Sequence, residues 1–153
     1  MISQTLCTSF KGEVLLGVHD FRATGGDTFK IAFYTANASL DATTTQYTST
    51  GEIVVSGYTA GGVALTNSGV STSGIVGLTS FSDASFTPAA SCTLRGALIY
   101  NTTPSALSAS GAALSNPAVC VLDFGADKVV PAGVPFVVHF PTADSTSAII
   151  RFG

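Results

Sequence analysis

The sequence predicts an all-β fold, an antiparallel β-sandwich or jelly roll with one short N-terminal helix, over a single domain of residues 1–153. Three observations lead to this fold class. The chain has 153 residues, enough for one domain with a substantial core. About eight to ten short strand-like segments alternate with turns rich in Gly, Pro and Asn. No internal repeat and no linker divides the chain into two.

The helix-like segment follows Ser9, a residue type that caps helix N-termini. Apolar residues from Phe10 to Val18 recur at spacings near four, as on one face of a helix. Gly17 stands where a helix would end. A short helix is therefore expected, with a strand from Glu13 to Val18 as the competing interpretation.

The clearest strand follows a turn signal at Thr24–Asp27. From Asp27 to Tyr34 the residues alternate, with Phe29, Ile31 and Phe33 on one side, which predicts a half-buried strand. The other expected strands are Glu52–Tyr58, Gly62–Thr66, Gly69–Ser73, Gly74–Phe81, Ser91–Tyr100, Pro117–Phe124, Val134–Phe140 and Ala148–Phe152. We expect a hairpin between the first two of these, and we expect the last to hold the C-terminus in a sheet.

Two polar segments are expected to lie outside the sheets. Asn37–Ser49 is rich in Thr and fits a surface loop. Thr102–Asn116 is neutral and of low complexity, and it is longer than the usual connections within a compact domain. It is either a contact arm for a partner or a flexible insertion.

The candidate interface residues lie in this long loop and in one strand. Arg95 is a lone charge in an apolar strand, so it needs an acceptor, either a carboxylate of the same chain or a group of a partner. The candidate residues are Arg95, Thr102, Pro104, Leu107 and Leu114.

Charge is scarce and unevenly distributed. Only 10% of the residues are charged, and 46% are hydrophobic, whereas about 25% are charged in an average soluble domain. No charged residue lies between Glu52 and Asp83, and none lies between Arg95 and Asp123. Long neutral surfaces favour coverage by other protein. The alternative is a Ser/Thr-rich β-surface that is simply uncharged.

The same composition argues against several classes of partner. The net charge is −3 and the six Lys and Arg residues are scattered, so binding to nucleic acid is not expected. Every apolar run is shorter than the roughly 20 residues of a membrane-spanning helix, and no signal peptide is visible at the N-terminus. Cys7, Cys92 and Cys120 form no metal-like cluster and are expected to be reduced structural thiols of a protein made in a cytoplasm.

No catalytic, cofactor-binding or metal-binding residues are predicted, and the chain is not expected to be an enzyme. The serines form no nucleophile elbow, and His139 lies in an apolar strand, where it is expected to be a structural residue or a satisfied interface residue. Asp123 and Asp127 flank a Gly and are typical of a turn. An enzyme, as the less favoured alternative, would depend on Asp123, Asp127 or His19.

Five stretches in this order resemble a group of small structural proteins encoded by tailed bacteriophages, over most of the chain from about Ser9 to Arg151. They are Ser9–Phe21 (SFKGEVLLGVHDF), Gly25–Tyr34 (GGDTFKIAFY), Ser56–Gly62 (SGYTAGG), Arg95–Asn101 (RGALIYN) and Val121–Gly125 (VLDFG). These motifs are turns and strands, and they carry no active residues to transfer.

The resemblance implies a virion component, most readily a capsid cement or decoration protein. Such a protein stabilises the shell by binding the major capsid protein and itself, as a dimer or trimer. It would lie on the capsid surface after assembly in the host bacterial cytoplasm. The alternative is a tail, fibre or host-surface carbohydrate-binding component of the virion. For sugar stacking, Tyr47, Tyr58 and Tyr100 are the plausible exposed aromatic residues.

Overall fold

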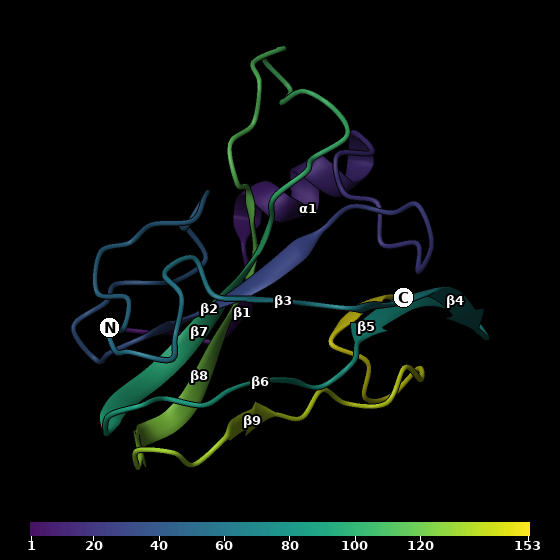
Figure 1. Cartoon of the computed structure of the whole chain (residues 1–153). Coiled ribbons are helices and arrows are strands. Elements are labelled where there is room, and N and C mark those ends of the chain that lie inside the picture. The colour runs from purple at the N-terminus through teal and green to yellow at the C-terminus, as the bar shows by residue number, and fades with distance from the viewer.

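The computed structural model describes residues 1–153 and consists of antiparallel sheets with one short helix (Figure 1). The all-β prediction with a short N-terminal helix is therefore confirmed. The elements are β1 Thr5–Leu6, α1 Thr8–Leu15, β2 Phe29–Tyr34, β3 Val63–Ala64, β4 Asn67–Ser73, β5 Val76–Phe81, β6 Ala84–Phe86, β7 Cys92–Asn101, β8 Ala118–Val130, β9 Phe136–Val138 and β10 Ile150–Phe152.

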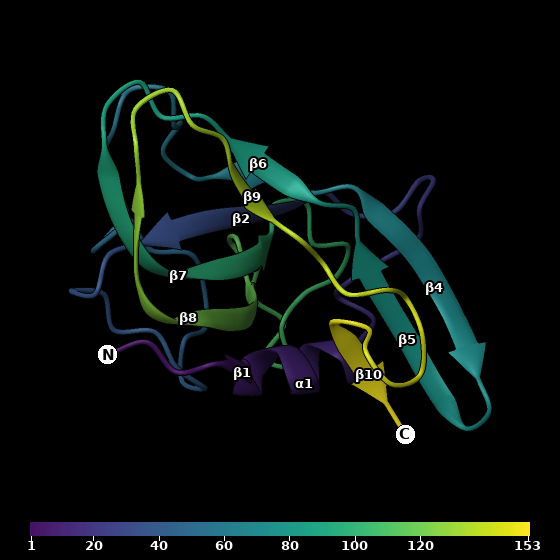
Figure 2. The ribbon, with the colours of Figure 1, turned by 90° about the horizontal axis from the view of Figure 1, so that it is seen from below.

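The strands form three sheets of unequal size, and their order is not given by the sequence pattern. The main sheet has the order β1-β8-β7-β2-β3, the second has the order β10-β5-β4, and β6 pairs with β9 as a ribbon. Because β10 pairs with β5, the last strand is held in a sheet, as expected. Figure 2 shows β6 and β9 crossing over the main sheet, with the β4–β5 hairpin at one side.

Aromatic side chains fill the space between the main sheet and the smaller ones. Phe29 of β2 lies 5.6 Å from Phe81 of β5, measured between ring centroids. Phe33 lies 5.0 Å from Phe86 of β6 and 5.7 Å from Phe136 of β9. The face of β2 that the alternation assigns to the core therefore packs against all the smaller sheets.

The opposite face of β2 is also buried, so the prediction of a half-buried strand is wrong. Ala32 and Tyr34 have no exposed surface. The covering chain includes the segment expected to be a polar surface loop, in which Ala38 and Leu40 are fully buried. The segment lies against this face, because the Tyr34 hydroxyl donates to the Thr48 carbonyl (2.6 Å).

The strand expected at Glu52–Tyr58, with its hairpin to the next segment, is not formed. Glu52 makes only an isolated bridge to Tyr34. The Ile53 N–H donates to the Phe33 carbonyl (2.9 Å), and the chain then turns, with the Tyr58 N–H donating to the Val55 carbonyl (3.2 Å). The following strand, β3, pairs with β2 instead.

The helix ends as expected but begins differently. Its N-cap is Cys7, and no side chain caps it. The Ser9 hydroxyl, predicted to cap the helix, has no hydrogen-bond partner. At the other end, Gly17 has a φ of 70°, and the N–H groups of Gly17 and Val18 donate to the carbonyls of Val14 (3.1 Å) and Glu13 (3.0 Å). This is the Schellman pattern that favours glycine.

Strand β8 runs through the segment predicted to be a turn. Gly96 pairs with Asp123 and Leu94 pairs with Lys128, so residues 124–127 lie opposite Arg95 alone. The extra residues make a large bulge. The bulge uses the same local chemistry as a turn, because the Gly125 N–H donates to the Asp123 carboxylate (2.9 Å).

Candidate functional site

Three of the five predicted interface residues come together in the loop at residues 102–116. This loop has no regular structure, as expected, and projects from the body of the molecule beyond β7 and β8 (Figure 1). Pro104, Leu107 and Leu114 line a hollow of about 210 Å³ within it. The Leu107 side chain is 54% exposed. The loop therefore presents apolar surface to solvent.

Thr102 and Arg95 have structural contacts of their own. The N–H and the hydroxyl of Thr102 both donate to the Thr28 carbonyl (2.8 Å each), which ties the start of the loop to the residue before β2. Arg95 lies toward the other end of β7. Its Nε donates to Asp123 Oδ1 (3.0 Å), and its Nη1 is 3.9 Å from Asp127 Oδ1. The predicted pairing of Arg95 with a carboxylate of the same chain is confirmed.

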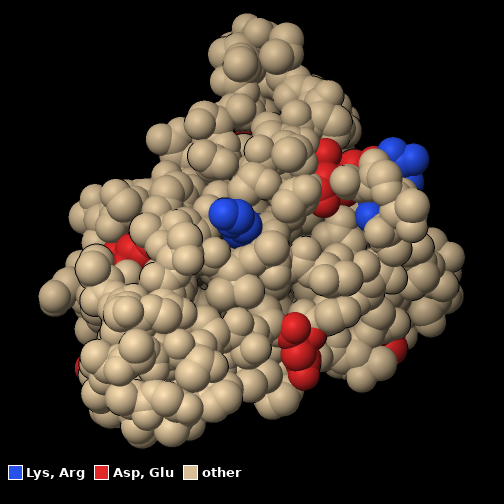
Figure 3. All heavy atoms as spheres, viewed as in Figure 1, with Lys and Arg blue, Asp and Glu red and all other residues tan.

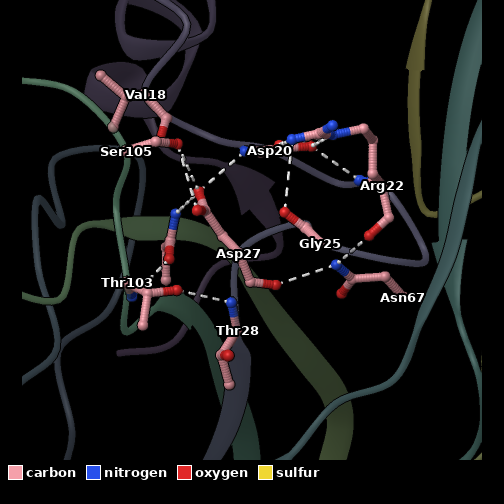
Figure 4. Close-up of polar contacts among 10 residues, drawn as sticks. Val18, Asp20, Arg22, Gly25, Asp27, Thr28, Asn67, Thr103 and Ser105 are labelled. Atoms are coloured by element: carbon pink, nitrogen blue, oxygen red, sulfur yellow. Dashed lines mark hydrogen bonds and ion pairs between the residues drawn. The ribbon is translucent and has the colours of Figure 1, made fainter.

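Asp27 is the centre of a polar cluster at the base of the loop (Figure 4). Its carboxylate accepts hydrogen bonds from the Asp20 N–H (2.9 Å), from Asn101 Nδ2 (2.8 Å) and from the Ser105 hydroxyl (3.2 Å). The Asp27 backbone carbonyl accepts from Asn67 Nδ2 (3.0 Å). One side chain thus joins the segment after the helix, the end of β7 and the projecting loop.

His19 lies behind this cluster, and its side chain is fully buried. Asn101 Nδ2 can only donate, so His19 Nδ1 is the acceptor across their 3.1 Å contact. His19 Nε2–H therefore donates to Glu13 Oε2 (2.7 Å). Burial lowers the pKa of His19 below its usual value, and the hydrogen bond to Glu13 opposes that shift. The ring is neutral at physiological pH.

The geometry of this network suits positioning. Ser105 donates to Asp27 and makes no hydrogen bond with His19, so the serine and the histidine do not form a nucleophile–base pair. His19 packs among aromatic rings in tilted arrangements, with Phe10 at 5.0 Å and Phe29 at 6.4 Å between ring centroids. The network holds the base of the projecting loop to the core.

A second cluster surrounds Glu52, a buried carboxylate. Tyr47 and Tyr58 donate their hydroxyls to it (2.6 Å each), and the Gly61 N–H donates as well (2.8 Å). Tyr100 lies stacked on Tyr47, with ring centroids 4.8 Å apart, and is 3% exposed. The tyrosines considered for sugar stacking are therefore occupied by contacts within the chain.

These contacts predict a stability that is lost at high pH. Burial is the main cause that raises the pKa of Tyr34, Tyr47 and Tyr58 well above the ordinary 10.0, and burial raises that of Tyr100 to about 12. Unfolded tyrosines ionise first, so this contribution to stability is complete below pH 10.0 and falls as the pH rises through the folded values. We expect the urea midpoint to drop steeply above pH 10.0.

Phenolate absorbance provides the measurement. In the folded protein the four tyrosines are expected to ionise together with unfolding, whereas urea-unfolded protein titrates near the ordinary value of 10.0. Gradual ionisation near that value, with the fold retained, would show that the tyrosines are not enclosed.

The outer surface carries few charges. On the face drawn in Figure 3, acidic and basic side chains lie together at the upper right, a few others stand singly, and the rest of the surface is uncharged. Large hydrophobic residues are exposed at many places: Met1, Leu15, Leu16, Val54, Val70, Ile75, Leu107, Val129, Val134, Val137 and Phe152. His139 is also exposed, and it contacts Asp83 (2.6 Å).

The remaining chemistry-bearing groups are dispersed. No three His, Cys, Asp or Glu side chains lie together in a way that could hold a metal ion. The three cysteines are free thiols, as predicted, and burial is the main cause that raises the pKa of Cys7 to about 12. No helix is long and apolar enough to cross a membrane.

Comparisons with protein-family models, with curated proteins and with solved structures found no match.

Proposed function

We propose that this chain is a structural protein of a bacteriophage virion, a capsid cement or decoration protein that binds the major capsid protein and itself. In this role it lies on the outer surface of the shell and is assembled in the bacterial cytoplasm. Its action is contact across neighbouring capsid subunits, with no chemical step.

The observation that carries the proposal is the uncharged surface with many exposed apolar side chains. Val54 is 98% exposed, Ile75 91% and Leu15 88%. A contact of about 1,600 Å² at about 25 cal/mol per Å² provides a large gross free energy, from which the costs of association are subtracted. Repetition over a symmetric shell multiplies many such contacts.

A sugar-binding role for the same protein has less support. Stacking on sugars needs exposed aromatic faces, and Tyr47, Tyr58 and Tyr100 are instead bonded or stacked within the chain. A position in the tail is the alternative to a position on the shell. The two positions differ in the number of copies of the protein per particle.

Quantitative mass spectrometry of purified virions tests the proposal. A capsid cement protein is expected at on the order of hundreds of copies per particle, whereas roughly a dozen or fewer would place the chain at a tail or vertex. Capsids that lack the protein provide a second readout, because added protein should co-sediment with them.

Two variants of the projecting loop locate the contact. Leu107→Asp puts a charge on the exposed apolar part of the loop and is expected to reduce co-sedimentation about tenfold or more. Ser110→Asp, at an exposed position of the same loop, is the matched control and should bind like the wild type. If both variants bound to capsids as well as the wild type, the loop would not be part of the contact.

A further inference from the structure

The outer edge of β4 has no partner strand. β4 is the last strand of the sheet β10-β5-β4 and lies at the rim of the projecting hairpin (Figure 2). Backbone groups along a free edge are a template for another strand. Natural sheets usually protect such an edge with charges or proline. β4 reads Asn-Ser-Gly-Val-Ser-Thr-Ser and has neither.

The first part of this edge is occupied by the chain itself. The Asn67 side chain donates to the Arg22 carbonyl (3.1 Å), and a side-chain carbon at Gly69 would lie 3.6 Å from Ala23. The free part is therefore Val70–Ser73, where all four residues are exposed.

The hairpin register decides which backbone groups face outward. Ser73 pairs with Val76 across the two-residue turn Gly74–Ile75, and Gly74 has a φ of 60°, as the first residue of a type II′ turn requires. The residues next to such a turn bond to each other, and the pattern then alternates. Ser73 and Ser71 direct their backbone groups to β5, so Val70 and Thr72 direct theirs outward.

We propose that the β4 edge binds the β4 edge of a second copy of this chain, antiparallel and centred on Ser71. In this register Val70 faces Thr72 of the second copy, and Thr72 faces its Val70. Each pair exchanges two hydrogen bonds, so the four outward groups on each side are satisfied. The two sheets become one continuous six-stranded sheet of order 10-5-4-4-5-10.

The charge pattern favours a second copy as the occupant. In a two-fold pairing the same surface meets itself, so a charge near the axis would face an identical charge. The chain between Glu52 and Asp83 has no charged residue, and this stretch contains the whole β4–β5 hairpin. Self-pairing here brings no like charges together.

The proposal rests on the assembly role proposed above for its biological setting, but it is tested on purified protein alone. The interface is small, so weak association is expected, and sedimentation should show dimers only at high protein concentration. A strictly monomeric protein at hundreds of micromolar would overturn the proposal and would leave the capsid measurements unaffected.

Cysteine variants test the register. Ser71→Cys places two thiols across a non-hydrogen-bonded pair with Cα atoms about 4.5 Å apart, within the range of a disulfide. We expect rapid formation of covalent dimers. Ser73→Cys lies on the same strand and is also exposed, but its two copies are about 13 Å apart and should not cross-link. The wild type shows how much cross-linking arises from the native cysteine Cys92. Equal cross-linking of the Ser71→Cys and Ser73→Cys variants would overturn the proposed register.

Charge variants test the same contact without a covalent bond. Ser71→Lys and Ser71→Glu each put like charges opposite one another in the dimer. Each variant alone is therefore expected to dimerise at least about tenfold more weakly than the wild type. A mixture of the two should recover dimers, which also shows that both variants are folded. A mixture that stays monomeric while the wild type dimerises would contradict pairing at Ser71.

Discussion

Replacing Glu52 with alanine is expected to destabilise the protein by about 3–5 kcal/mol, from the loss of three hydrogen bonds to a buried carboxylate. The Tyr47 hydroxyl, the Tyr58 hydroxyl and the Gly61 N–H would all lose their acceptor in a site that water does not reach freely. Urea unfolding, followed by circular dichroism, measures the change. The segment around Glu52 forms no regular strand. The hydrogen bonds of the Glu52 side chain therefore hold this segment in place where backbone hydrogen bonds would hold a strand.

Two further variants make the measurement specific. Glu52→Gln keeps the shape and one acceptor oxygen, so it should lose less stability than the alanine variant. Asp127→Ala removes a carboxylate whose side chain is 54% exposed and 3.9 Å from its cation, and should change stability by less than about 0.5 kcal/mol. If Glu52→Ala were no more destabilising than Asp127→Ala, the tyrosine cluster would have no structural role.

Sequence periodicity identified β2 but not its full environment. Alternation with a period of two assigns Phe29, Ile31 and Phe33 to one face, and that face is the core. Ala32 and Tyr34 fall on the other face, which also carries the polar residue Lys30, yet both are buried, in part under the irregular segment that follows β2. Coverage by an irregular segment has no period, so the sequence cannot indicate it.

The turn signals were reliable about local chemistry and unreliable about topology. Gly17 ends the helix as expected. The Asp123–Lys128 segment has turn residues, but it forms a bulge within β8 because it faces Arg95 of β7. A bulge and a turn need the same residue types, and only the neighbouring strand distinguishes them.

The projecting loop could be predicted from its composition, whereas the residues that hold it could not. Asp27 and Asn101 are single polar residues without a motif, and the bond between them spans 74 positions in the sequence. Asn101 directly follows the buried run Ala97–Tyr100. A polar residue at the end of such a run is the one signal that indicates a buried polar contact.

Replacing Asn101 with aspartate is expected to cost about 3–5 kcal/mol at neutral pH, although the two side chains have the same shape. Asn101 has no exposed surface. Its Nδ2 donates to Asp27 Oδ2 (2.8 Å) and to His19 Nδ1 (3.1 Å), and its Oδ1 accepts from the Thr103 N–H (2.9 Å). The aspartate would replace the donor by a charged oxygen that faces the Asp27 carboxylate.

Alanine at the same position separates repulsion from simple loss of hydrogen bonds. Asn101→Ala should cost about 2 kcal/mol, because it removes the bonds without adding a charge. Acidification protonates one of the two facing carboxyls in the aspartate variant, so its deficit relative to alanine should shrink as the pH falls. Urea unfolding of both variants at neutral and acidic pH measures this. Equal stability of the two variants at neutral pH would mean that the Asp27 carboxylate does not face position 101.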